Sequence, residues 1–275
     1  MKGFVKLMFR TLFLALSMTC IGASAKAHEF WIDPVQHQVA AGETVIADIR
    51  VGQDFEGGAY SFIPRSIRRF DFAMNGDIQP VQGTVGDRPA MVVAPQDEGL
   101  LVAIHVTTDS RLTWATWEKF ENFLKHKDLT WGLAEHDARG LSRENVRERY
   151  SRYAKSLIAV GHGKGSDIEA GLLTEIIALE NPYTDDMSDG LDMRATYEGA
   201  PLKDTQIEVY EKAADGTVNV FTSRTDEAGV ATIPVKPGHR YMLDAVVLRA
   251  LEVKEETDPA WESLWANLTF EVPAR

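Results

Sequence analysis

Residues 191–201 read LDMRATYEGAP. Leu191, Met193, Ala195 and Tyr197 occupy the odd positions of this stretch and alternate with polar residues at the even positions. A period of two is the pattern of a β-strand that buries one face. Gly199-Ala200-Pro201 then supplies turn residues. The stretch therefore predicts β structure for the C-terminal part of the chain.

The same two signals, short apolar-rich runs and turn residues, continue to the C-terminus. The turns are Asp215-Gly216, Asp226–Gly229 and Pro237-Gly238, and the last run contains Leu268, Phe270 and Val272. Short strands separated in this way are typical of a small antiparallel sandwich. We therefore expect one β-sandwich over residues 188–275.

Toward the N-terminus, Val45 to Val51 alternates in the same way, and so do residues 100–107. The acidic, turn-prone segment Thr184–Gly190 separates these strands from the C-terminal ones and is typical of an interdomain linker. We expect a mainly β protein with two antiparallel β-sandwich modules, over residues 28–185 and 188–275.

A helical period interrupts the first module, at about residues 114–157. Trp117, Phe120 and Leu124 recur at helical spacing, which predicts a helix from Trp114 to His126. Val146, Tyr150, Tyr153 and Leu157 predict a second helix over 142–157, with its many charged residues on a solvated face. The stretch between them, 129–140, has no clear pattern, and a surface lid is one interpretation of it.

The first 27 residues have the features of a signal peptide. Basic residues are followed by an apolar run from Leu12 to Ile21, and small residues then form a cleavage site. We therefore expect export to the periplasm. No later segment has the roughly 20 consecutive apolar residues of a membrane-spanning helix. Cys20 is the only cysteine of the chain and lies in the signal, so we expect a soluble mature protein without disulfides.

The formal net charge of the chain is −12. Removal of the signal, which carries four basic and no acidic residues, makes it −16. This sign argues against a nucleic-acid partner, because nucleic-acid binding depends on neutralising phosphates with basic residues.

The expected cleavage site also suggests a metal site. Cleavage before His28 would place a free α-amine beside its imidazole, and the pair could chelate Ni(II), Co(II) or Cu(II). Cleavage before Lys26 would make His28 the third residue, an arrangement that suits square-planar Cu(II) or Ni(II). A third interpretation is purely structural: His28 follows the cleavage site and joins the first strand.

Any such metal site must be assembled in three dimensions, because no two histidines are three or four residues apart. The histidines are His28, His37, His105, His126, His136, His162 and His239. We predict His105 as the second ligand, since alternation over residues 100–107 directs it to the less apolar face of its strand. A hydrogen-bonded surface histidine is the alternative interpretation of His105.

Other motifs match no enzyme. No serine lies in a Gly-x-Ser-x-Gly elbow, and no spacing marks two carboxylates as an acid and base pair. We therefore expect a protein that is not an enzyme.

Several short motifs together resemble a known family. They are His28-Glu29-Phe30-Trp31, residues 149–157 (RYSRYAKSL), Glu180-Asn181-Pro182-Tyr183, Gly199-Ala200-Pro201-Leu202 and Asp226–Gly229. The chain resembles domain-of-unknown-function family 4198, whose members are periplasmic and are described as nickel-uptake-like. The resemblance implies two β-sandwich modules, Ig-like or carboxypeptidase-regulatory-like, with a helical insertion in the first. It also implies an association with nickel or cobalt uptake, without catalytic residues.

Three hypotheses follow. The first is a periplasmic protein that binds nickel, cobalt or copper, or delivers it to an envelope metal transporter or receptor. The second is a non-catalytic interaction module that docks on an envelope transporter or on a carbohydrate. The third is a copper oxidase that uses an amino-terminal histidine.

Overall fold

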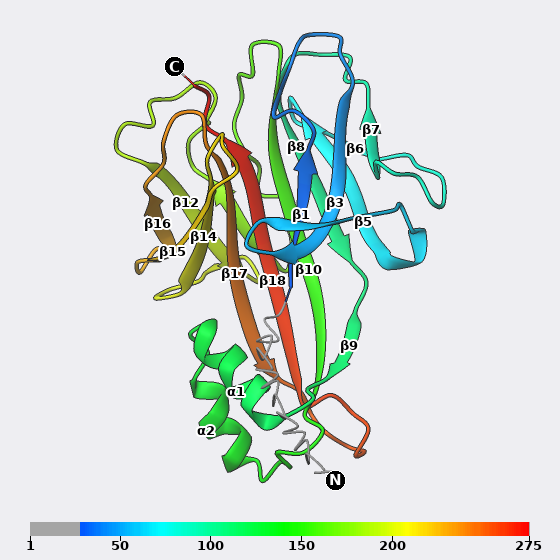
Figure 1. Cartoon of the computed structure of the whole chain (residues 1–275), viewed down its shortest axis with the longest axis vertical. Coiled ribbons are helices and arrows are strands. Elements are labelled where there is room, and N and C mark those ends of the chain that lie inside the picture. The colour runs from blue at the N-terminus through cyan, green and yellow to red at the C-terminus, as the bar shows by residue number, and fades with distance from the viewer. Residues whose placement is uncertain (1–27, 275) are drawn as a thin grey trace, which may run out of the picture.

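The computed structural model describes residues 28–274 and confirms a mainly β fold (Figure 1). The predicted signal peptide, with its cleavage site, lies outside the described residues. No helix among residues 28–274 is both long enough and apolar enough to cross a membrane.

A mixed sheet of ten strands, sheet B, forms the centre of the molecule, and eight of its strands follow one path, β15-β14-β17-β18-β10-β8-β5-β6. In that order they are β15 (Val218–Arg224), β14 (Gln206–Lys212), β17 (Arg240–Ala250), β18 (Trp261–Glu271), β10 (Arg147–Val160), β8 (Gly99–Thr107), β5 (Ile67–Met74) and β6 (Asp77–Pro80). Two further strands, β2 (Gln38–Val39) and β9 (Ser110–Thr113), pair with β10.

Two smaller sheets of four strands each accompany sheet B. Sheet A consists of β1 (Glu29–Pro34), β3 (Val45–Gln53), β4 (Glu56–Tyr60) and β7 (Met91–Val93). Sheet C consists of β11 (Thr174–Ala178), β12 (Leu191–Tyr197), β13 (Ala200–Pro201) and β16 (Val230–Ile233). The helices are α1 (Trp117–His126), α2 (Trp131–Ala138) and the short 3-10 helix η1 (Pro64–Ser66).

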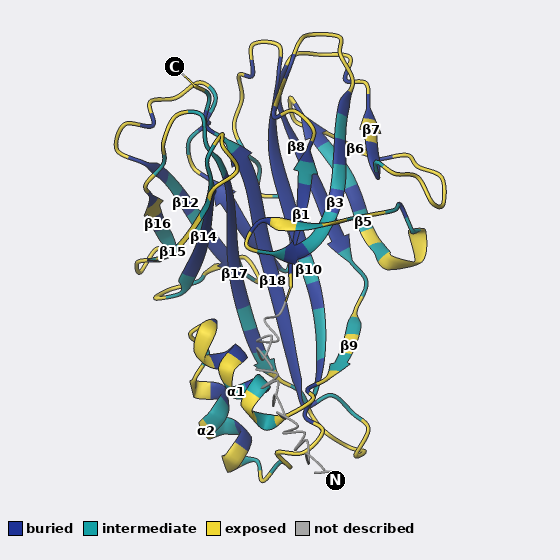
Figure 2. Ribbon diagram, viewed as in Figure 1, coloured by how far each residue is buried: buried dark blue, intermediate teal, exposed yellow. Residues whose placement is uncertain are grey.

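Sheets A and C cover opposite faces of sheet B. Along β8, Val102 and Ile104 pack into a core with sheet C, whereas Leu101 and Ala103 pack into a core with sheet A. Figure 2 shows the consequence, since β8, β10, β17 and β18 are buried over most of their length. Sheet B therefore forms one β-sandwich with sheet A and another with sheet C, and the two share this central sheet.

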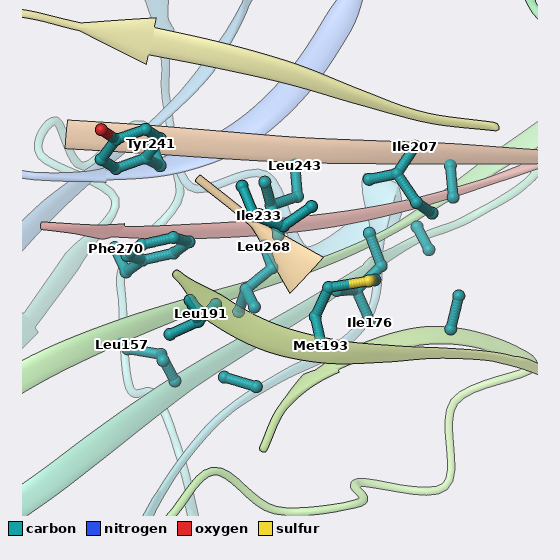
Figure 3. Packing of buried hydrophobic residues seen from close by; sticks show 14 of the residues in the cluster. Leu157, Ile176, Leu191, Met193, Ile207, Ile233, Tyr241, Leu243, Leu268 and Phe270 are labelled. Carbon is teal, nitrogen blue, oxygen red and sulfur yellow. The ribbon is translucent and has the colours of Figure 1, made fainter. Parts of the chain in front are cut away.

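The core with sheet C draws on both halves of the sequence (Figure 3). Leu157 of β10 packs in the same cluster as Leu191 of β12 and Leu268 of β18. Met187, within the segment expected to be a linker, is also buried in this cluster. One sheet thus crosses the boundary expected at residues 185–188, because β18 pairs in parallel with β10 from Glu148–Trp261 to Ser156–Thr269.

The predicted first helix is confirmed as α1, but the predicted helix over 142–157 is wrong. Those residues belong mostly to β10, a strand of 14 residues. Because sheets A and C cover both faces of β10, apolar residues are needed on both faces: Tyr153 and Leu157 face sheet C, and Ala154 and Ile158 face sheet A. A strand buried on both faces loses the alternation that would identify it.

The helical region is therefore confined to α1 and α2, which lie together at one end of the long strands of sheet B (Figure 1). The stretch 129–140 is not a separate lid. His136 of α2 is buried and accepts a hydrogen bond from Trp261 Nε1 of β18 at 3.0 Å. Gly132 lies so close to Leu124 and Leu248 that a Cβ atom there would clash with a side chain.

Candidate functional site

A cavity of about 300 Å³ lies where β1 begins, between β9, β10, β18 and the start of α1. Its lining residues that can bind a ligand are His28, Trp114, Lys119, Glu148, Arg152 and Trp265, and Tyr150 adds a further aromatic ring. Most of these residues were expected in the helical insertion or on its solvated face. Their gathering around His28 makes this cavity the candidate site.

Strand alternation directs three of the polar groups into the cavity. Glu148, Tyr150 and Arg152 are alternate residues of β10 and share the face on the side of sheet A. Trp265 lies directly across from Arg152 in the parallel pairing of β10 with β18. Lys119 enters from the first turn of α1, where the Thr116 hydroxyl caps the helix by accepting from the Lys119 N–H at 3.3 Å.

Glu148 is the buried acid of the cavity wall. It accepts hydrogen bonds from Trp114 Nε1 at 2.8 Å and from the Ser263 hydroxyl. Burial raises the pKa of Glu148 to about 7, against the opposing effect of these two donors. At neutral pH this carboxyl group therefore exchanges a proton readily, and it can donate as well as accept a hydrogen bond.

Arg152 places a positive charge in the wall of the same cavity. Its guanidinium group lies 4.7 Å from the centre of the Tyr150 ring and 5.8 Å from that of Phe30. One terminal nitrogen donates to the His28 carbonyl oxygen at 3.0 Å, which ties the start of β1 to β10. The Arg152 Nε is buried, and no residue from 28 to 274 accepts its hydrogen. Such a group can still donate to a ligand.

Stacked aromatic rings hold the wall rigid. Phe123 of α1 stacks on Trp114 at 5.1 Å and on Trp265 at 5.8 Å between ring centroids. Trp265 Nε1 donates to the Ser263 hydroxyl at 2.8 Å, and that hydroxyl donates in turn to Glu148. The aromatic wall and the acid are therefore positioned by the same network.

A cluster of buried charges lies behind the cavity, on the same face of sheet B. Lys127 forms ion pairs with Glu208 and, at 3.0 Å, with Asp244. The Tyr210 hydroxyl contacts Glu208 at 2.9 Å and Glu29 at 3.0 Å. We call these five residues the Lys127 cluster.

The acids of the Lys127 cluster differ in charge state. Burial raises the pKa of Glu29 to about 7, and it also raises the pKa of Asp244 despite the nearby Lys127 ammonium. Burial would likewise raise the pKa of Glu208, but the hydrogen bond from His126 and the charge of Lys127 outweigh it and hold the pKa at about 2.

The structure does not bring the two predicted metal ligands together. His28 is exposed at the cavity, as a terminal ligand would need to be. His105 is buried instead, with ring centroids 5.1 Å from Phe30 and 4.9 Å from Phe70. Burial lowers the pKa of His105 to about 3, and neither ring nitrogen has a hydrogen-bond partner.

His105 lies on the face of β8 opposite to Val102 and Ile104, as the alternation predicts, but sheet A covers that face, so His105 is neither a surface residue nor hydrogen-bonded. Over residues 28–274, no three His, Cys, Asp or Glu side chains are placed to hold a metal ion. The described residues do not fit the assembled His28 and His105 site.

Sequence reasoning found His28 and missed Glu148, Arg152, Lys119 and Trp265. No local signal could have identified these residues, because their proximity depends on the pairing of β10 with β18 and on the docking of α1. The one available hint was the charge-rich segment 143–155, since charged residues on a strand of a covered sheet must find partners.

Comparisons with known proteins agree with the motifs quoted above. A family model described as "Domain of unknown function (DUF4198)" matches residues 25–249. No curated protein matches the chain.

Three solved structures are similar to the chain at low TM-score. A tetra-tandem repeat from the extending region of a large adhesion protein has 12% identity and a TM-score of 0.21, with 90% of this chain and 50% of that chain covered. This chain therefore spans half the length of that structure. The D0-D1 domain of Intimin has 13% identity and a TM-score of 0.21, covering 88% and 97%. A DUF3823 family protein from Bacteroides uniformis has 10% identity and a TM-score of 0.21, covering 90% and 100%.

Proposed function

The chain belongs to the DUF4198 family, and we propose that it is a binding module that holds a small organic anion in the cavity at the start of β1. The observation that carries the proposal is the unpartnered, buried Nε of Arg152 beside a cavity with an aromatic wall. A guanidinium group with a free donor is well suited to a carboxylate, sulfonate or phosphate.

The remaining residues of the cavity support an anion with an apolar body. Lys119 supplies a second positive charge, and Glu148 is uncharged in part of the molecules at neutral pH, so it adds little repulsion. Trp114, Tyr150 and Trp265 offer ring surface and ring edges. A volume of about 300 Å³ is at the lower end for ligand pockets, which favours a small molecule.

The proposed module needs no catalytic step, in keeping with the expectation that the protein is not an enzyme. Its expected signal peptide supports a periplasmic location. Docking on an envelope transporter or receptor would allow the ligand bound in this cavity to be transferred to that partner.

A second candidate function is metal binding by the His28 terminus alone. The exposed position of His28 supports it, since a ring at the surface can meet nickel, cobalt or copper from solvent. If export leaves His28 as the first residue, its amine and imidazole would form the chelate, and other ligands would come from outside residues 28–274.

Titration with anilinonaphthalene sulfonate, an anion with an apolar body, tests the first proposal. We expect binding of about one equivalent, with energy transfer from the tryptophans of the wall. Lys119→Gln and Arg152→Gln should each weaken binding about tenfold, because each removes a charge-assisted contact of about 1.5 kcal/mol or more. Lys125→Gln is the matched control, since Lys125 lies on the same helix but pairs with Glu121 at the surface. Equal affinity in all four proteins would refute the proposal.

The metal candidate is tested with three preparations whose first residue is established by mass spectrometry: authentic His28, a Gly-Ser extension and His28→Ala. Calorimetry with Cu(II) and Ni(II) should show one site only in the authentic form, stronger as the pH rises, because both ligands must lose protons. Equal affinity in the authentic and extended forms would exclude the terminus as the site.

A further inference from the structure

Lys155 is buried in the apolar core between sheets B and C, on the face of β10 opposite to the cavity. The side chains of Lys155 and Asp167 are 0% exposed, and that of Glu175 is 1% exposed. Tyr153 and Leu157, two residues to either side on the same face of β10, belong to the hydrophobic core. We call Lys155, Asp167 and Glu175 the Lys155 triad.

The amine of Lys155 faces the carboxyl carbon of Asp167. Its Nζ lies 2.8 Å from Oδ1 and 3.0 Å from Oδ2, so it sits between the two oxygens. Glu175 Oε1 lies 3.0 Å from the same Nζ. The third hydrogen of the ammonium group is donated to the Ile168 carbonyl oxygen at 2.7 Å. The Lys155 amine, the Asp167 carboxyl group and the Glu175 carboxyl group are therefore in contact, with their side chains shielded from bulk solvent.

We propose that Lys155 and Asp167 condense to an intramolecular isopeptide bond, with Glu175 as the group that transfers the protons. The chemistry is the formation of an amide from an amine and a carboxylic acid. No oxidant, cofactor or second substrate is needed, since water is the only other product.

The reaction balances within the triad. Lys155 ammonium passes a proton to Glu175, and the neutral amine attacks Cγ of Asp167 as that carboxyl group turns about its Cβ–Cγ bond. The nitrogen then loses a second proton, the C–O bond breaks, and the departing oxygen takes up both protons and leaves as water. The amide nitrogen keeps one hydrogen, and Glu175 ends as the carboxylate with which it began.

Backbone donors are placed to stabilise the charge that develops on Asp167. The Ile168 N–H donates to Oδ1 at 2.7 Å, and the Ala178 N–H donates to Oδ2 at 2.9 Å. Donors fixed in this way stabilise the tetrahedral intermediate of acyl transfer. Glu175 is held similarly, because its oxygens accept from the Ala170 N–H at 2.7 Å and the Leu172 N–H at 3.2 Å.

The surroundings favour the neutral product. Two unit charges in an apolar interior carry a large desolvation penalty, and the amide removes both of them. Burial raises the pKa of Asp167, which eases the protonation that its leaving oxygen requires. Fixed contact between the amine and the acid also replaces a bimolecular encounter, which is a large advantage for intramolecular reactions. The product would tie β10 to the segment that precedes β11.

Mass spectrometry of the exported, folded protein tests the proposal. We expect the intact mass to be one water lighter than the sequence that starts at the observed first residue. Digestion with trypsin should leave Lys155 uncut and give a fragment in which peptide 153–164 is joined to peptide 165–194 through Lys155 and Asp167.

Two variants make the result specific. Glu175→Gln keeps the amine and the acid but lacks the base, so its mass should match its sequence. Glu169→Gln is the matched control, because Glu169 is 52% exposed on the same segment, and this variant should lose the water as the wild type does. A folded wild type of full mass overturns the proposal, and so does a water loss that fragmentation places away from Lys155.

Discussion

Lys127 and Lys155 are both buried beside two carboxylates, yet they lie on opposite faces of sheet B and in different surroundings. The Lys127 cluster lies next to a cavity and to His126, whose side chain is 43% exposed. The Lys155 triad is enclosed by the apolar core with sheet C. The comparison shows that the groups around a buried lysine, more than its ion pairs, decide what it can do.

Two features separate the clusters. The carboxylates of the Lys155 triad accept backbone N–H groups, whereas Glu208 accepts from His126 and Tyr210 side chains. The charges of Asp244 and Glu208 raise the pKa of Lys127 although burial opposes them, which favours the protonated amine. Buried polar atoms without partners occur on both sides, in Glu29, Arg152 and Asn267 toward sheet A and in Thr174 toward sheet C, but only Arg152 among these four lines the candidate cavity. We therefore assign ligand binding to the face toward sheet A and covalent cross-linking to the other.

The largest loss of stability should come from removing the N-terminal strands of sheet B, which contribute to the cores on both of its faces. The alternation and turns of residues 188–275 predict a separate C-terminal module, but this segment shares sheet B and a core with β8 and β10, so we expect the isolated fragment not to fold alone. The fragment would expose β18 along its parallel edge and lose the β8 and β10 side of the core with sheet C. We expect no cooperative unfolding transition by circular dichroism in urea. A cooperative transition and dispersed proton NMR signals would show that the C-terminal module is independent after all.

Substitution of the two lysines should give the next largest effects, and unequal ones. Lys155→Met removes the partner of Asp167 and Glu175 in the apolar core, and with it the proposed cross-link, so we expect a loss of at least about 3–5 kcal/mol in the free energy of unfolding. Lys127→Met should lose less, about 1–3 kcal/mol, because His126 and Tyr210 still contact Glu208. Urea titrations at neutral pH measure both values. Equal losses would contradict the contrast between the faces.

The titration of Glu148, which lines the cavity, should make the stability of the protein depend on pH. Its pKa is raised from 4.5 to about 7 in the folded protein, so the folded state binds the proton more tightly than the unfolded state. This stabilisation is fully present below pH 4.5 and is lost as the pH rises through 7. Relative to Glu148→Gln, the wild type should lose up to about 3 kcal/mol across that window.

Urea midpoints between pH 4.5 and 8 measure this difference between wild type and Glu148→Gln. The contribution of Glu29, which titrates in the same window, is present in both proteins and cancels. Glu227→Gln is the control, because the Glu227 side chain is 91% exposed, and its curve should run parallel to that of the wild type. A parallel curve for Glu148→Gln as well would mean that Glu148 does not titrate near neutral pH.

The smallest effect on stability should come from substituting His105, and this substitution should raise the stability of the protein. His105→Leu replaces a neutral ring whose two nitrogens lack partners with an apolar side chain of similar size, so we expect a gain of about 1 kcal/mol in stability. Affinity for Cu(II) or Ni(II) should not change. Thermal unfolding and calorimetry check the two parts, and a loss of metal affinity would restore His105 as a ligand.

The sequence by itself determined the β class, the sandwich packing, the first helix and the family. These depend on local signals: alternation in residues 191–197, turn residues at close intervals, the period of three to four from Trp117 to Leu124, and short motifs. The sequence also singled out His28 as a candidate residue, and His28 lies at the candidate site.

Only the tertiary structure decided that the sandwiches share one sheet, that residues 147–160 form a strand, and that His105 is buried. Each of these depends on a second sheet covering a face that a single strand would leave to solvent. The same holds for the cavity and the Lys155 triad, whose residues meet through the pairing of β10 with β18 and the packing of sheet C on β10. Local patterns indicate which residues prefer burial, but the element that buries them is determined by strand pairing and sheet packing between residues far apart in the sequence.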